Sequence, residues 1–147
     1  MHRKIMINGE SWCRTLTGVE RLAIEVTQAL DSLFAPNEAE LIVPKNAVNV
    51  PELKNIKVVK LNVKANFFPI WTQIFFQAYV LLHHGISFDF SNTCPFFTPG
   101  VEFIHDIYAK LYPESFISKR DKLIHLYHLI MYRTIAKRAK KIFTVYE

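Results

Sequence analysis

The sequence predicts an α/β fold: a doubly wound, mainly parallel sheet flanked by helices. Short apolar runs typical of buried strands alternate along the chain with longer stretches whose apolar residues recur every three or four positions. Half of the 147 residues are hydrophobic and only four are glycine, which indicates a folded core rather than a disordered chain. Because this length suits one domain, we expect residues 1–147 to form a single Rossmann-like unit.

The first strand is expected over residues 3–8, whose centre is an apolar run suited to a sheet covered on both faces. A helix should follow over residues 19–33, where apolar residues recur at helical spacing and polar residues such as Glu20 face solvent. Either Thr15 or Thr17 can cap the start of this helix.

Two further strands are expected over residues 40–44 and 56–61, the second at an edge of the sheet because lysines interrupt its apolar run. A helix should then run over residues 69–84, and Gly85 is expected to end it in a left-handed conformation. The predicted inner face of this helix is formed by Trp71, Phe75, Ala78, Tyr79 and Leu82.

The second half of the chain repeats the alternation. Strands are expected over residues 86–92 and 101–106, a long helix over 118–139, and a final buried strand over 140–147. The predicted core-facing stripe of the long helix consists of Leu123, Leu126, Tyr127, Ile130, Met131, Ile135 and Ala139.

Candidate site residues lie where the predicted strands end, which is the edge at which doubly wound sheets bind ligands. Thr17 and Gly18 join the first strand to the first helix, either as a plain helix start or as a phosphate site at a helix N-terminus. His105 can contact a sugar hydroxyl or a phosphate, or can be satisfied by a backbone carbonyl. Asp106 can serve the same site or cap the following turn, and Asn92 follows a neighbouring strand.

Charge and cysteine content limit the classes of binding partner and the cell compartment that we expect for this chain. The net charge of +5 is concentrated after Lys110, which favours anionic partners such as an acidic membrane surface or leaves a solvated helix face. No nucleic-acid recognition motif is recognisable, so nucleic acid is not expected as a partner. The two cysteines, Cys13 and Cys94, indicate neither a disulfide framework nor a metal site. Without a secretory-signal pattern, the expected location is the cytoplasm.

Five segments together resemble a known family. In chain order they read RTLTGVERLAIEVTQAL, PIWTQ, FDFSN, VEFIHDIYAKLYPESF and AKRAKKIFTVYE. Their order and spacing resemble the N-terminal half of glycosyltransferase family 4 enzymes, which have the two-domain GT-B fold. The resemblance implies a retaining transferase that moves a sugar from a nucleotide-diphosphate donor to a cell-surface polysaccharide or a lipid-linked acceptor, without a metal or other cofactor.

The resemblance also implies roles for individual residues. Gly18 corresponds to the family's glycine near the donor phosphates, and His105 corresponds to the histidine beside the transferred sugar. We therefore expect His105 and Asp106 to be catalytic, and Thr17, Gly18 and Asn92 to bind substrate or donor. The family's C-terminal donor-binding domain is not among these residues, so the chain alone is expected to be nearly inactive.

A non-enzymatic alternative stays open at this point. In that reading the chain is a truncated α/β module that docks on a membrane or on a partner subunit through its basic C-terminal helix. Either function is compatible with a cytoplasmic protein that lies peripherally on the inner face of the membrane.

Overall fold

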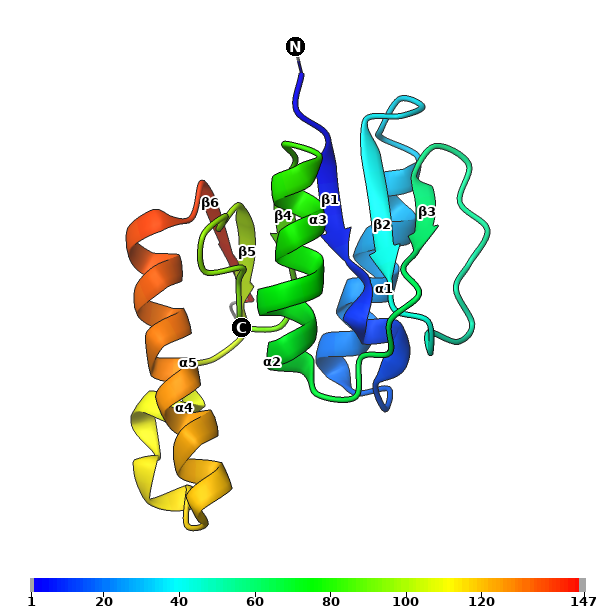
Figure 1. The fold of residues 1–147 in the computed structure, drawn as a ribbon. Coiled ribbons are helices and arrows are strands. Elements are labelled where there is room, and N and C mark those ends of the chain that lie inside the picture. The colour runs from blue at the N-terminus through cyan, green and yellow to red at the C-terminus, as the bar shows by residue number, and fades with distance from the viewer. Residues whose placement is uncertain (1, 146–147) are drawn as a thin grey trace.

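Six strands form one parallel sheet in the order β3-β2-β1-β4-β5-β6 in the computed structural model, which describes residues 2–145 (Figure 1). The strands are β1 (Ile5–Asn8), β2 (Ala39–Val43), β3 (Lys57–Lys60), β4 (Ile86–Asp89), β5 (Val101–Ile104) and β6 (Lys141–Thr144). The predicted doubly wound α/β sheet is confirmed. Its strand order changes direction between β1 and β4, which places the expected ligand crevice at the carboxyl ends of these two strands.

Helix α1 (Gly18–Asp31) covers one face of the sheet, where Ile7, Leu41 and Phe88 form a core cluster with Ala23 of the helix. A 3-10 turn over Gly9–Cys13, which the sequence pattern did not indicate, joins β1 to this helix. Glu20 was expected in solvent but is buried, because its carboxylate accepts the backbone N–H of Thr17 at 3.1 Å and pairs with Arg14.

The opposite face is covered by one continuous helical segment that runs from Phe68 to Leu82. It comprises α2 (Phe68–Ile70), a π-helical stretch (Trp71–Phe76) and α3 (Gln77–Leu82). The buried apolar positions are Trp71, Phe76 and Val80, whereas Leu82, predicted on the inner face, is 78% exposed. The prediction was wrong there because a π-turn spaces equivalent positions five residues apart and rotates the buried face.

The turn before β4 also differs from the prediction. His84, rather than Gly85, has the positive φ value, at 52°. Gly85 instead makes a close contact: a Cβ at this position would overlap the side chain of Met6 in the neighbouring strand β1, which would have to move.

Helix α5 (Lys119–Arg138) follows α4 (Tyr108–Leu111) and a short 3-10 turn (Pro113–Ser115). Met131 and Ile135 in its second half are buried against the sheet. The first half extends past the sheet beside α4 (Figure 1). Part of the predicted core stripe is exposed: Leu123 at 65% and Leu126 at 53% in this first half, and Ile130 at 42% just beyond it.

The last strand exists as predicted, but it is not buried. All four residues of β6 are exposed, because β6 is an edge strand that pairs only with β5 in the sheet. Tyr146 and Glu147, which the prediction included, lie outside the described residues. The edge position predicted for β3 is confirmed by the strand order.

Replacement of Gly100 by alanine should lower the free energy of unfolding by at least about 2 kcal/mol, because the added Cβ would overlap the main chain of Ser87 in β4. Gly18→Ala is the matched control. A Cβ at Gly18 meets no atom within 4 Å, so that variant should change stability by less than about 1 kcal/mol. Urea unfolding followed by circular dichroism measures both, and equal stabilities of the two variants would contradict the close packing at Gly100.

Candidate functional site

A cleft of about 550 Å³ opens at the carboxyl edge of the sheet, beside the point where the strand order changes direction. Its walls come from the loop after β1, the starts of α1 and α2, the loop after β4, and α5. Ionisable and polar side chains that line it include Glu10, Arg14, Thr17, Asn92, Arg120 and His128. Such a position is where a doubly wound sheet binds its ligand.

A buried hydrogen-bond network centred on Asn8 lies at the inner end of this cleft. The Nδ2 of Asn8, the last residue of β1, donates to Asp89 Oδ2 at 2.7 Å and to Thr72 Oγ1 at 3.2 Å. Its Oδ1 accepts the indole N–H of Trp71 at 2.8 Å and the backbone N–H of Glu10 at 3.2 Å. Asn8 therefore joins β1, β4 and the π-helical stretch at the strand ends.

Two carboxyl groups belong to this network, and both are fully buried. Thr72 Oγ1 donates to Glu10 Oε2 at 3.3 Å, and the backbone N–H of Ser91 donates to Asp89 Oδ1 at 3.0 Å. Burial raises the pKa of Glu10, although the positive charge of Arg14 opposes the shift. Burial and the nearby carboxylate of Glu10 raise the pKa of Asp89 to about 7. At neutral pH the pair therefore holds a proton that exposed carboxylates would have lost.

A third buried carboxyl lies next to Asp89 in the sheet. Glu102 of β5 is the direct partner of Asp89 of β4 in the strand register, and it has no exposed surface. Burial, together with the charge of Asp89, raises the pKa of Glu102 well above its usual value. Only Glu10 of the three lines the cleft, so the other two lie behind its wall.

Arg14 is the best-positioned cation of the cleft. Its guanidinium lies 4.0 Å from the ring centroid of Phe68 and 3.5 Å from the carboxylate of Glu20. The Nε of Arg14 is buried and has no hydrogen-bond partner among residues 2–145. The Nδ1 of His128, on the α5 wall, is also unpartnered within the described part of the chain, and burial lowers the pKa of this histidine. The cleft thus presents polar atoms that a ligand can satisfy.

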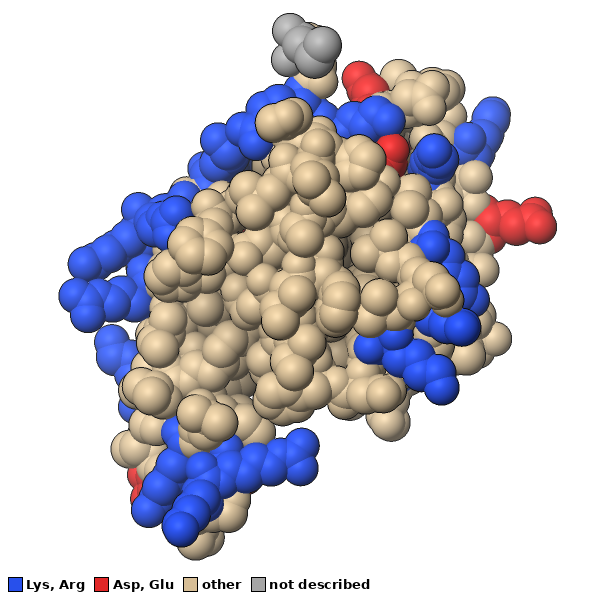
Figure 2. Space-filling view, viewed as in Figure 1, with Lys and Arg blue, Asp and Glu red and all other residues tan. Residues whose placement is uncertain are grey.

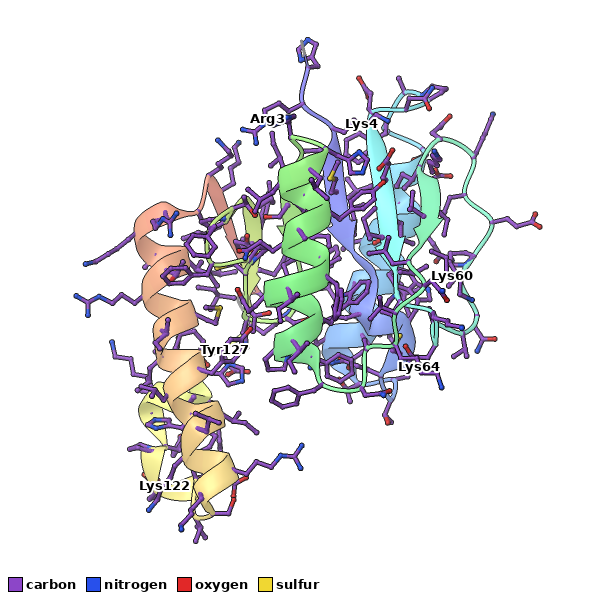
Figure 3. The ribbon with its side chains drawn as sticks, viewed as in Figure 1. Arg3, Lys4, Lys60, Lys64, Lys122 and Tyr127 are labelled. Atoms are coloured by element: carbon purple, nitrogen blue, oxygen red, sulfur yellow. The ribbon has the colours of Figure 1, made fainter. Side chains whose placement is uncertain are left out.

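Gln73 ties α5 to the helical segment Phe68–Leu82. Its Nε2 donates to the hydroxyl of Tyr127 at 3.0 Å and to the carbonyl of Cys94 at 2.7 Å, and its Oε1 accepts the N–H of Phe96. Figure 3 shows Tyr127 on α5 on the side that faces this segment. These contacts hold the two walls of the cleft at a fixed separation.

The predicted site residues divide into two groups. Thr17 and Asn92 line the cleft, and Gly18 is the first residue of α1 next to it. His105 and Asp106 follow the carboxyl end of β5 but do not line the cleft. These five residues therefore lie at the same edge of the sheet, but only two of the five line the cleft.

His105 and Asp106 both have local hydrogen-bond partners. The Nε2 of His105 donates to the carbonyl of Phe90 at 2.5 Å, and its backbone N–H donates to Asn92 Oδ1 at 2.6 Å. Asp106 Oδ1 accepts the backbone N–H of Tyr108 at 2.9 Å, as in a turn-capping aspartate. His105 thus holds Asn92, a residue of the cleft wall, in place.

Sequence reasoning places the loop from Asn8 to Gly18 at this edge but does not single out Asn8, Glu10 or Arg14. It misses Thr72 and Asp89 altogether. Asn8 and Asp89 carried a usable signal, because each is a polar residue at the end of an apolar strand. Glu10 and Arg14 belong to a loop whose 3-10 turn was not anticipated. Thr72 lies in the π-helical stretch, for which the sequence pattern shows no indication.

Comparison of the chain with models of protein families, with curated proteins and with solved structures found no match. The resemblance to glycosyltransferase family 4 therefore stays a prediction. No helix within residues 2–145 is long and apolar enough to cross a membrane. Nor do the described residues bring together three or more His, Cys, Asp or Glu side chains in a way that could hold a metal ion.

Proposed function

We propose that this chain is the acceptor-side domain of a retaining glycosyltransferase that uses a nucleotide-diphosphate sugar and needs no metal or other cofactor. The observation that carries the proposal is the cleft at the switch point of the sheet, which combines Arg14 and Arg120 with the buried carboxyl of Glu10. Cations suit the phosphates of the donor, and a carboxyl suits a sugar hydroxyl.

The N-terminus of α1 adds to the positive potential of the cleft. Thr17 and Glu20 form a capping box at its first turn, and the N–H groups that this box leaves free attract a phosphate. Gly18 leaves that approach open, because no atom lies within 4 Å of the place where its Cβ would be. A diphosphate held between this helix start and Arg14 would lie above the strand ends.

The carboxyl of Glu10 can form a hydrogen bond with a hydroxyl of the acceptor sugar whether Glu10 is protonated or ionised. Because burial raises its pKa, Glu10 carries a proton at neutral pH more often than an exposed glutamate does. The protonated form can donate to an acceptor oxygen, and the ionised form can accept a hydroxyl proton. His105 and Asp106 complete the proposal as the residues nearest the transferred sugar, and Asn92, bonded to the His105 N–H, links them to the cleft.

Transfer itself would require a second, donor-binding domain that closes over this cleft, because the donor must be held on both sides for its phosphates and sugar to share one geometry. The acceptor in the proposal is a polysaccharide or a lipid-linked sugar, used at the inner face of a membrane by a peripheral cytoplasmic enzyme. The alternative function, docking on a membrane or partner subunit through α5, stays a prediction alongside it.

The binding part of the proposal predicts that Arg14→Ala weakens binding of nucleotide-diphosphate sugars about tenfold, because a charge-assisted contact to phosphate is lost. NMR titration of the isotopically labelled chain with a panel of such sugars measures this, and the amide signals of Thr17 and Asn92 should move. Arg21→Ala removes a matched charge from the exposed side of α1, outside the cleft, and should leave affinity unchanged within about twofold. Equal affinities of the two variants would contradict the cleft as the donor site.

A further inference from the structure

A second hollow, of about 250 Å³, lies at the opposite edge of the sheet, where the strands begin. Arg3 precedes β1, Ser87 lies at the start of β4, Gly100 precedes β5 and Lys140 precedes β6. Four strand starts therefore surround the hollow, and the carboxyl-edge cleft lies at the other end of the same strands. Figure 3 shows Arg3 at the start of β1 and Tyr127, a residue of the cleft wall, farther down on α5.

Three cations line this hollow, and none of its lining residues is acidic. Arg3, Arg138 and Lys140 make no ion pair with a carboxylate among residues 2–145, where the salt bridges are Lys4 with Glu40 and Arg14 with Glu20. Figure 2 shows basic side chains along the edge that leads from the upper end of α5 to the start of β1. The positive charge of the hollow is therefore not neutralised by neighbouring side chains.

Main-chain carbonyls hold both arginines in place. Arg3 donates from Nε to the carbonyl of His84 at 2.9 Å and from Nη2 to that of Gly85 at 2.6 Å. Arg138 donates from Nη1 to the carbonyl of Phe96 at 2.7 Å, and its guanidinium lies 5.6 Å from the Phe96 ring centroid. A guanidinium has more N–H donors than these carbonyls use, so each arginine keeps donors for a ligand in a preset orientation.

The floor of the hollow offers hydroxyl groups and no negative charge. Thr98 Oγ1 is buried and has no hydrogen-bond partner within the described residues, although Thr98 lines the hollow. Glu102 lies behind the floor, where its Oε1 accepts the backbone N–H of Gly100 at 2.8 Å. Burial and the charge of Asp89 raise the pKa of Glu102, which favours the neutral form of this carboxyl and weakens its repulsion of an anion.

We propose that this hollow binds a small, multivalent phosphate-type oxyanion through Arg3, Arg138 and Lys140, with the hydroxyl of Thr98 as an additional donor. Preset guanidinium groups without carboxylate partners are suited to phosphate oxygens, which accept several charge-assisted hydrogen bonds at once. The site is separate from the carboxyl-edge cleft and does not depend on the function proposed for that cleft. The proposed occupant is a phosphorylated compound free in solution, and an acidic membrane surface is the competing outcome that the test distinguishes.

Calorimetric titration with inorganic pyrophosphate at pH 7 and constant ionic strength tests the proposal. We expect saturable binding that Arg138→Gln and Lys140→Gln each weaken about tenfold, the loss of one charge-assisted contact. The Lys140 side chain makes no hydrogen bond within residues 2–145, so the second variant should fold normally. Thr98→Val keeps every charge and should weaken binding about fivefold through the lost hydroxyl.

Lys122→Gln is the charge-matched control, because Lys122 lies in the first half of α5, away from the hollow (Figure 3). It should change affinity by less than about twofold. No binding of pyrophosphate, or equal losses in Lys140→Gln and Lys122→Gln, would overturn the proposal. A parallel flotation assay uses vesicles of phosphatidylcholine with and without phosphatidic acid. Loss of vesicle binding in Lys140→Gln without any pyrophosphate binding would also overturn it and assign the surface to a membrane instead.

Discussion

Replacement of Asn8 by alanine should lower the free energy of unfolding by at least about 3 kcal/mol, one of the largest effects expected of a single polar substitution in this chain. The Asn8 side chain is buried and makes four hydrogen bonds. Its removal leaves the indole N–H of Trp71 and the backbone N–H of Glu10 without an acceptor. A buried donor without a partner costs about 1–3 kcal/mol. Asp89 would also lose its contact with the Asn8 amide.

Urea unfolding followed by circular dichroism measures this loss at a single pH. Asn66→Ala is the matched control, because Asn66 is exposed and its side chain makes no hydrogen bond in the described structure. That variant should stay within about 0.5 kcal/mol of the wild type. If Asn8→Ala were equally mild, the network at the strand ends would not be the organising contact of the cleft.

The stability of the protein should fall as the pH rises from about 4 to about 7, and Asp89→Asn should remove much of this dependence. Because the pKa of Asp89 is raised in the folded state, from 3.8 to about 7, the folded state binds more protons than the unfolded state in this range. The stabilisation from protonated Asp89 is fully present below the pKa of this group in the unfolded state. It is lost as the pH rises through its pKa in the folded state. Three pKa units correspond to about 4 kcal/mol as an upper limit.

Urea titrations at intervals between pH 4 and pH 8 measure the slope. Ile7→Val is the control, because it removes one buried methyl group from β1 and no titratable group. It should lower stability by about 1 kcal/mol at every pH. Some dependence of stability on pH should remain in Asp89→Asn, because burial shifts the pKa of Glu102 in the same direction. Parallel profiles for Asp89→Asn and the wild type would show that Asp89 is ionised in the folded protein.

Alternating patterns in the sequence were enough to predict the sheet. Each of the six strands was expected within a few residues of its observed bounds, and so were α1 and α5. Strand and helix periodicities are local properties of the chain, because they follow from the direction of each side chain along its own backbone. The parallel arrangement followed in turn from the alternation of strands with helices.

Burial was harder to predict than secondary structure. Leu123 and Leu126 continue the apolar stripe of α5 but are exposed, because the first half of this helix extends past the sheet. The buried positions Phe76 and Val80 depend on a π-turn, which shifts the helix face without a pattern that can be read beforehand. Both errors arise because burial depends on what lies opposite a side chain in the folded state.

The sequence by itself determined the α/β class, the parallel sheet and the edge at which Thr17, Asn92 and His105 would lie, because strand direction places every strand end on one side. Only the tertiary structure decided which residues form the cleft. Glu10 and Asp89 are 79 positions apart along the chain, and the neighbouring strands β1 and β4 bring them into one buried pair. Burial raises the pKa of both groups, and the charge of Glu10 raises that of Asp89 further, which happens only once the chain has folded.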